Sequence, residues 1–396
     1  MASLLLLTAC ASGLSTQAAK PASPAPQSLP VVRADSPVTT APLLPAPAVA
    51  SPVPPPSGSD ARARTPEANS PHIAIILPLT SRTLGKAADA VRQGFLAGAN
   101  ADGKNALAFR IYSAEDDAAS LSAQYRKAVT DGAQVIVGGV TRDGANVMAR
   151  ESSNYLPSLA LNAPTVTNEN ELPDRFFYIS LNLDWEARFG ARTAANDGLR
   201  RVAILASTTP LSKRVQESFE KEWSRLGGEI AARISVAGDL SEGPRVQSVM
   251  EKANADVVFL AAEMKIARFA RPYLPAGIPV FATSLTIDPR ADAVENLDLD
   301  SVRFMEMPWF VQPDHPAVMA YAKPAEPLPI EYERLYALGI DAWRLAQMVV
   351  TSDKPRGFAP LDGVTGRITL ENHQFVRQLA AGEMRDGRPV LFKPSE

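Results

Sequence analysis

Short apolar runs alternate along the chain with segments whose apolar residues recur at helical spacing. The first run, residues 72–78 (HIAIILP), is continuous and closed by proline, which is typical of a buried parallel strand. In the segment that follows, apolar residues recur every three or four positions, so we expect an amphipathic helix over 83–99. The same pair of patterns then repeats, which indicates an α/β fold.

The repeats fall into two groups. The first group predicts strands at 108–112, 134–137 and 158–161 and helices at 118–130 and 143–152. The second predicts strands at 201–205, 229–236, 255–261 and 278–282 and helices at 212–226, 246–253 and 264–271. Because strands and helices alternate in each group and an irregular stretch separates the groups, we expect two doubly wound, Rossmann-like lobes.

A third section completes the predicted lobes. It comprises residues 302–310, a long helix over 331–351 and a turn into a β-hairpin at 363–370. We therefore place a bilobal domain at 72–396. The expected lobes are lobe 1, about 72–183 plus part of 302–396, and lobe 2, about 184–301 plus the remainder.

The stretch before this domain has a different composition. Residues 11–71 are mainly Ala, Pro, Ser, Thr and Val, and 14 of the chain's 34 prolines lie in this stretch after Lys20. Such a segment buries too little apolar surface to offset its ordering entropy, so we predict a disordered, partly polyproline-II linker. At about 3.1 Å per residue it would reach at most about 190 Å. It would hold the domain off a membrane; a ligand for an SH3-like module is the alternative.

The chain has one cysteine, Cys10, which follows four leucines and Thr8-Ala9. This order resembles the lipobox of bacterial lipoproteins, so we interpret residues 1–10 as a shortened lipoprotein signal with its lipobox. The resemblance implies that Cys10 is diacylated at sulfur and becomes the acylated first residue after cleavage. Ala11, rather than Asp, implies sorting to the outer membrane. The alternative is a lone cysteine in a frayed terminus.

The composition of the chain excludes several classes of protein and several kinds of site. The chain is 46% apolar and 21% charged with a net charge of −3, which excludes wholesale disorder and argues against binding nucleic acid. No apolar run approaches the roughly 18–20 residues that span a bilayer. One cysteine excludes intrachain disulfides and Cys-based zinc sites, and His72, His315 and His373 are too far apart in sequence for a local metal motif. We expect no metal and no cofactor.

Three stretches of sequence partly match motifs of catalytic or phosphate-binding sites, and each has a simpler structural interpretation. Residues 98–105 nearly match a phosphate-binding loop, but they follow a helix and precede a strand, which is the wrong order. Residues 218–221 match SxxK, but Lys-Thr-Gly is absent and the tetrad falls in a predicted surface helix. The acidic residues 115–117 precede a helix, which favours capping over half of a glycosidase carboxylate pair. With His315 and His373 taken as ordinary surface or loop residues, we expect no enzyme.

Polar residues follow the predicted strands at the edge where ligands of open α/β sheets bind. These candidate cleft-lining residues are Thr80, Ser81, Thr141, Asn162 and Thr165 in lobe 1, and Ser207, Thr208, Glu263, Thr283 and Ser284 in lobe 2. Their hydroxyl and amide groups could hold a zwitterionic ligand. The same residue types also cap helices at strand-to-helix turns, and this alternative stays open.

Several stretches resemble known proteins. Residues 75–81 (IILPLTS), 92–99 (RQGFLAGA) and 131–139 (DGAQVIVGG) are typical of the type I periplasmic binding protein fold of branched-chain amino-acid receptors. Residues 281–284 (FATS), 304–309 (FMEMPW), 336–345 (YALGIDAWRL) and 363–366 (GVTG) are similar to the LppC/LpoA family. This second similarity covers about 72–396. The best-known members of the family carry a helical-repeat domain before this module, where this chain has its proline-rich linker.

The family resemblance implies a function. It predicts an outer-membrane lipoprotein on the periplasmic side, with a membrane anchor, that binds and activates a bifunctional penicillin-binding protein. Two alternatives stay open: a periplasmic receptor for amino acids or similar solutes of an ABC importer, and a cell-wall hydrolase. Trp309 and Phe310 are candidates for an exposed docking surface, with burial as the alternative.

Overall fold

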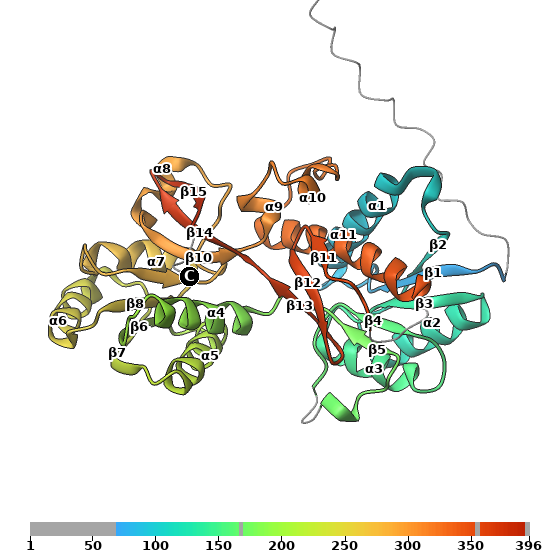
Figure 1. Ribbon diagram of the computed structural model, residues 1–396, viewed down its shortest axis with the longest axis horizontal. Helices are drawn as coiled ribbons and strands as arrows, with labels where there is room; N and C mark the ends of the chain where they lie inside the picture. Colours follow the sequence, from blue (N-terminus) through green and yellow to red (C-terminus); the bar gives the residue numbers. More distant parts are fainter. Residues whose placement is uncertain (1–68, 166–168, 353–356, 393–396) are drawn as a thin grey trace, which may run out of the picture. The chain divides into compact units, whose positions relative to one another are not determined.

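A computed structural model describes residues 69–165, 169–352 and 357–392 (Figure 1). The predicted lipobox with Cys10, and the predicted linker as far as residue 68, lie outside the described residues. Within the described ranges, no helix combines the length and the apolar character that crossing a bilayer requires.

The first sheet has eight strands among the described residues, in the spatial order β11-β12-β13-β5-β4-β3-β1-β2. They are β1 (His72–Leu77), β2 (Phe109–Ser113), β3 (Ala133–Gly138), β4 (Ser158–Ala160), β5 (Phe176–Tyr178), β11 (Leu361–Gly363), β12 (Gly366–Glu371) and β13 (Gln374–Gln378). The pairs from β5 to β2 are parallel. The helices packed on this sheet are α1 (Gly85–Asp102), α2 (Ala118–Thr130), α3 (Arg142–Ser152) and α11 (Ile330–Thr351). Together these elements form lobe 1.

The second sheet has seven strands in the described part of the chain, in the order β15-β14-β10-β9-β8-β6-β7. They are β6 (Arg201–Ser207), β7 (Glu229–Val236), β8 (Val257–Ala261), β9 (Val280–Ala282), β10 (Val302–Glu306), β14 (Ala380–Arg385) and β15 (Arg388–Leu391). Its helices are α4 (Leu183–Asn196), α5 (Pro210–Arg225), α6 (Gly243–Ala253), α7 (Met264–Ala270) and α8 (Ala293–Asn296). Together these elements form lobe 2.

Three connections between the lobes, here called the crossovers, lie within the described residues. The first, 179–182, joins β5 to α4, and the second, 307–329, joins β10 to α11. The second contains the short helices α9 (Pro308–Val311) and α10 (Pro316–Met319). The third is Leu379 alone, so β13 runs almost directly into β14 (Figure 1). Two parallel-dominated sheets covered by helices confirm the predicted class of two doubly wound lobes.

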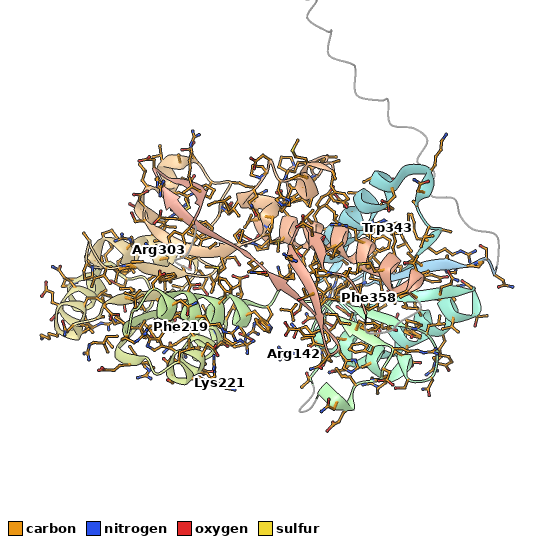
Figure 2. The ribbon with its side chains drawn as sticks, in the orientation of Figure 1. Arg142, Phe219, Lys221, Arg303, Trp343 and Phe358 are labelled. Carbon is orange, nitrogen blue, oxygen red and sulfur yellow. The ribbon has the colours of Figure 1, made fainter. Side chains whose placement is uncertain are left out.

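Each lobe has its own aromatic core. In lobe 1, Trp343 of α11 packs edge-on against Phe95 of α1, with ring centroids 5.2 Å apart, and its indole N–H donates to Asp102 at 2.7 Å. In lobe 2, Phe219 of α5 stacks on Phe259 of β8 with centroids 3.9 Å apart. All six residues of β1 are buried, as its continuous apolar run predicts. Figure 2 shows the side chains of both lobes.

Some elements were missed by the apolar pattern. β5 has only three residues, Phe-Phe-Tyr, which is shorter than the runs that indicate a strand. α4 buries alanines and a glycine rather than large apolar residues, so its apolar face is weak in sequence. Within residues 302–310, β10 ends at Glu306 and Pro308 begins the short helix α9.

Candidate functional site

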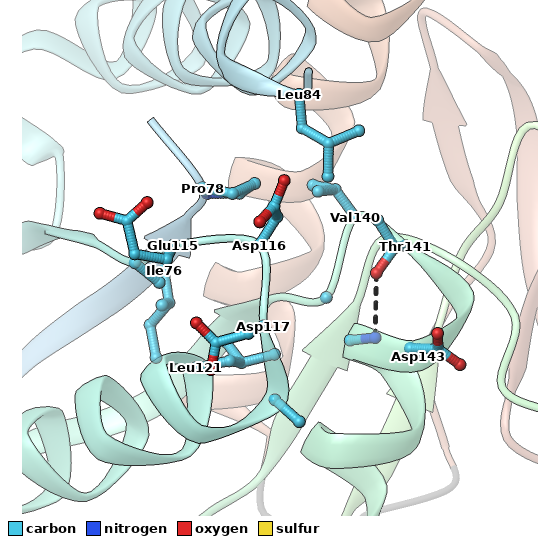
Figure 3. A pocket seen from close by; sticks show the side chains of 14 residues that line it. Ile76, Pro78, Leu84, Glu115, Asp116, Asp117, Leu121, Val140, Thr141 and Asp143 are labelled. Atoms are coloured by element: carbon cyan, nitrogen blue, oxygen red, sulfur yellow. Dashed lines mark hydrogen bonds between the residues drawn. The ribbon is translucent and has the colours of Figure 1, made fainter. Parts of the chain in front are cut away.

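A pocket lies in lobe 1 at the carboxyl ends of β1, β2 and β3, the edge of the sheet where the topology places ligand sites (Figure 3). Its lining is partly apolar and partly acidic. The residues labelled in Figure 3 are Ile76, Pro78, Leu84, Leu121, Val140 and Thr141, with the acidic Glu115, Asp116, Asp117 and Asp143. The cavity volume is about 40 Å³, room for about three water molecules at the 10–15 Å³ that each requires.

Thr80 and Ser81, which were predicted to line a cleft, are not among the residues that line this pocket, and their hydroxyls already have partners. Ser81 donates to Asp116 at 2.6 Å and accepts from the Leu84 N–H at 3.0 Å. Thr80 donates to the carboxylate of Glu115 at 2.8 Å. The hydroxyls of Ser81 and Thr83 hold the pKa of Asp116 below its usual value. The structure therefore uses these groups to join the β1–α1 turn to the residues that follow β2.

The other lobe 1 candidates organise turns. Thr141 is the N-cap of α3 and accepts from the Gly144 N–H at 3.0 Å, the dashed line in Figure 3. Asn162 donates to the Val140 carbonyl at 3.0 Å. Thr165 is exposed, and its backbone N–H donates to Asn146. Capping therefore accounts for Thr141, and turn stabilisation accounts for Asn162.

The electrostatics of the pocket disfavour an anionic group. Among the described residues that line it there is no lysine or arginine, whereas four carboxylates are present. Asp117 is the N-cap of α2 and accepts from the N–H groups of Ala119 and Ser120, which confirms that the acidic residues 115–117 include a helix cap. The carboxylate of an amino acid would meet these like charges without a cation to pair with.

In lobe 2, the corresponding hydroxyls form a closed network. Ser207 donates to Ser212 at 2.7 Å, and Thr209, the N-cap of α5, donates to Glu263 at 2.5 Å. Burial alone would raise the pKa of Glu263, but hydrogen bonds from Ser207, Thr209 and Ser212 outweigh it and lower that pKa. Thr208 is exposed beside the cap. Sequence reasoning missed Thr209 by one position, although Thr-Thr-Pro at the start of a helix is a capping signal.

The last two candidates, Thr283 and Ser284, are buried after β9. The Thr283 hydroxyl has no hydrogen-bond partner within the described residues. Ser284 donates its N–H and its hydroxyl to Glu186 of α4, at 2.7 and 3.0 Å. Burial raises the pKa of Glu186 to about 7, and the neighbouring Glu306 carboxylate adds to the rise. Glu186 was not singled out in the sequence, because nothing local distinguishes it from a surface glutamate.

The structure also tests what the sequence predicted for Trp309 and Phe310, for His373 and for Lys221. Trp309 is 1% exposed and donates its indole N–H to Glu333 at 2.8 Å, so it belongs to the core, and Phe310 is partly buried. His373 lies in the β12–β13 turn, as the interpretation of a surface or loop residue allows; it is buried, and its ring contacts the Phe176 carbonyl. Lys221 is exposed on α5 (Figure 2), as the interpretation of residues 218–221 predicts.

Within the described residues, no cluster of three or more His, Cys, Asp or Glu could hold a metal.

Solved structures define the class of this fold. A structure from Chromobacterium violaceum ATCC 12472, described as a "putative branched-chain amino acid ABC transporter", is 35% identical, with a TM-score of 0.67 and coverage of 80% of this chain and 100% of that chain. Full-length LpoA from Haemophilus influenzae is 20% identical, with a TM-score of 0.65 and coverage of 83% of this chain and 60% of that chain. The described domain is therefore a bilobal module of the periplasmic-binding-protein type.

Sequence comparison identifies the family. The model "LppC putative lipoprotein" matches residues 66–242 and 234–387, so the chain belongs to the LppC family, which confirms the resemblance seen in the sequence. "Penicillin-binding protein activator LpoA" of Enterobacter sp. (strain 638) is 24% identical over 281 residues, which is 60% of this chain and 38% of that protein. This chain thus spans less than half the length of that relative.

Proposed function

We propose that this protein regulates a bifunctional penicillin-binding protein by direct protein contact and raises peptidoglycan crosslinking. Membership of the LppC family, whose relatives include proteins named penicillin-binding protein activators, carries the proposal. The match covers 38% of the Enterobacter relative, so the activity and the partner are proposed for this chain and are not taken over from that protein's name.

The hydrogen bonds of the predicted cleft residues support protein contact over solute capture. The hydroxyls of Ser81, Ser207 and Ser284 donate to other groups of the protein. A ligand would have to replace these bonds, and each buried group left unpaired would cost about 1–3 kcal/mol. A regulator that works through its outer surface needs no such rearrangement.

The proposed location is the periplasmic face of the outer membrane, with acyl chains on Cys10 as the anchor. Two or three acyl chains hold a protein stably on a bilayer, whereas one is marginal. The proline-rich residues 11–71 would let the bilobal domain reach a synthase some distance from the anchor. Labelled palmitate fed to cells that express the gene should be incorporated, and Cys10→Ser should abolish the incorporation.

The activity is tested with purified components. The full chain carrying Cys10→Ser is added to a purified bifunctional synthase, and the crosslinked fraction of the newly made peptidoglycan is measured after digestion. We expect the chain to bind the synthase and to increase that fraction. An unchanged fraction together with no detectable binding would reject the proposal.

A second candidate, a solute receptor, rests on the 35%-identical structure described as a "putative branched-chain amino acid ABC transporter". A ligand present at 100 times its Kd would stabilise the protein by about 2.7 kcal/mol, which a thermal shift measurement detects. Leucine, isoleucine, valine and muropeptides are the probes. A shift with any of them, combined with no effect on crosslinking, would favour the receptor; a flat response would favour the regulator.

A further inference from the structure

Strand β2 is the outermost strand at one edge of the lobe 1 sheet (Figure 1). Within the described residues, β1 is the strand that pairs with it. The residues that flank β2, Ala108 and Ala114, bond to Ile73 and Leu77 of β1, with both N···O distances 2.9 Å. Main-chain groups alternate in direction along a strand, so every second residue of β2 directs its N–H and C=O away from β1. These residues are Phe109, Ile111 and Ser113.

The open edge of β2 lacks the features that commonly block edge strands. The strand contains no proline, and its register with β1 is continuous, so it has no bulge. Its one charged side chain, Arg110, is only 16% exposed and lies 3.9 Å from the carboxylate of Asp131. Ile111, at the middle of the strand, is 37% exposed. An edge of this kind is a template on which another strand can pair.

A groove of about 440 Å³ runs along this edge, between β2 and α2. The five residues of β2 line it together with Gln124 and Lys127 of α2. On this side the Lys127 ammonium lies 5.9 Å from the centroid of the Tyr112 ring. On the opposite face of β2, Phe109 packs edge-on against Phe95 of α1, with centroids 5.7 Å apart. The volume is within the range of about 300–1,000 Å³ that is usual for binding sites.

The groove carries a positive charge. Arg110 and Lys127 line it, and no carboxylate does so in the described part of the chain. The carboxylate of Asp131 lies 2.7 Å from Lys127 Nζ and 3.9 Å from the Arg110 guanidinium. One carboxylate between two cations leaves one positive charge in excess. Beyond the other end of β2, Glu115 accepts from Thr80, so the excess charge lies toward the start of the strand.

We propose that β2 is a docking edge for an extended segment of another protein in which acidic and apolar residues alternate. The segment adds to the sheet as a strand and bonds to the outward main-chain groups of β2. Because successive side chains point to opposite faces, its acidic side chains lie with Arg110 and Lys127, and its apolar side chains lie with Ile111. The inference goes beyond the proposed function and holds whether or not the synthase is the partner.

A second copy of this chain fits the same edge less well. Two β2 strands paired about a twofold axis would bring Arg110 and Lys127 of both copies to one seam. Like charges on facing strands are destabilising, whereas acidic side chains in the added strand are attracted to these cations. Charge complementarity therefore selects an acidic segment of a different protein as the occupant.

The probe is a fluorescein-labelled peptide in which valine and glutamate alternate, and fluorescence anisotropy follows its binding to the full chain with Cys10→Ser. We expect saturable binding that weakens as salt is added, because salt screens exposed charges. No binding at millimolar peptide, or binding that salt does not weaken, would overturn the proposal.

N-methylated peptides test strand addition directly. One peptide is methylated at the valine amides and another at the glutamate amides. Only one of these two sets of N–H groups faces β2 in an added strand, so one peptide should bind at least about tenfold more weakly, and the other as the unmodified peptide does. Equal binding of the two methylated peptides would show that the contact is not a strand addition.

Variants of the chain test the position of the peptide. Ile111→Pro removes an N–H that points away from β1, a position where edge strands tolerate proline, and it should weaken binding at least about tenfold. Lys127→Glu should weaken binding of the glutamate peptide and strengthen binding of the same peptide with lysine in place of glutamate. Lys221→Glu, at an exposed position of α5, is the control and should change neither. A misfolded chain cannot produce such an exchange of preference.

Two further results would overturn the proposal. If Ile111→Pro binds the peptide as the parent does, or if Lys127→Glu shows no exchange of preference, the peptide does not lie at this edge. Sedimentation velocity without peptide tests the second copy, and we expect a monomer. A dimer that Ile111→Pro dissociates would show that β2 pairs with another copy of this chain instead.

Discussion

Gly94 of α1 and Gly339 of α11 lie against the opposite helix backbone without any intervening side chain. A Cβ at Gly94 would lie 1.8 Å from the Tyr336 carbonyl oxygen, and a Cβ at Gly339 would lie 2.2 Å from that of Val91. These contacts are with backbone atoms, which cannot move aside as a flexible side chain can. The two helices therefore approach closely because both residues are glycine, and this contact fixes α11 on lobe 1.

Gly339→Ala should lower the free energy of unfolding by about 2 kcal/mol or more, because overpacking against backbone exceeds the gain of about 1 kcal/mol in helix propensity. Urea titration measures it. Gly190→Ala in α4 is the control, since its nearest neighbour would be a Phe259 ring atom at 3.8 Å; it should be neutral or slightly stabilising. Equal effects of the two substitutions would refute the close-approach argument.

Asp341 should be a large contributor to stability. It is completely buried in α11 and accepts from the Val364 N–H and from the N–H and hydroxyl of Thr365, at 2.6–3.0 Å. Asp341→Ala leaves those donors unpaired, so we expect a loss of about 3 kcal/mol in the free energy of unfolding. Thr365→Val, which removes only the hydroxyl, should cost about 1 kcal/mol. A loss below about 0.5 kcal/mol for Asp341→Ala would show that the turn is held by other contacts.

Global stability should depend on pH in two separate ranges. The pKa of Glu186 is raised to about 7, so its contribution is fully present below pH 4.5 and is lost as pH rises to about 7, by at most about 3 kcal/mol at 1.36 kcal/mol per unit. The pKa of Glu222 is lowered to about 2, so its contribution is present above pH 4.5 and is lost as pH falls toward 2.

Urea titrations between pH 3 and 8 separate the contributions of Glu186 and Glu222 to the free energy of unfolding. Glu186→Gln should flatten the curve between pH 4.5 and 7 and leave the acid limb intact. Glu222→Gln should do the reverse. If both variants keep the full pH dependence of the parent, other groups govern it.

Thr141→Ala should affect folding rather than recognition. The hydroxyl caps α3, and loss of such a cap costs about 1 kcal/mol. Thr165→Ala, at an exposed position, should leave stability unchanged. Under conditions where all variants are folded, stimulation of the synthase should equal that of the parent. A folded Thr141→Ala chain that fails to stimulate would place the partner or a ligand at this pocket.

The apolar pattern predicted the elements that bury large side chains. α2 and β7 have the predicted bounds, 118–130 and 229–236. The pattern could not supply β5, which is too short to show a period, or α4, whose buried face is mostly alanine. The strands β13 to β15 were also missed, because they lie partly exposed in hairpins where polar and apolar residues mix.

The two-lobed α/β class and the family could be predicted from the sequence, because the spacing of apolar residues and the local motifs are both properties of consecutive residues. The sequence also indicated the turn-forming role of residues such as Thr141 and Asp117, since capping acts over three or four positions. The folded chain was needed to show that Ser284 donates to Glu186, 98 residues away, and that Trp309 is buried. Such contacts form because the fold brings together strands and helices that are far apart in sequence, and the pattern of neighbouring residues does not specify which of them meet.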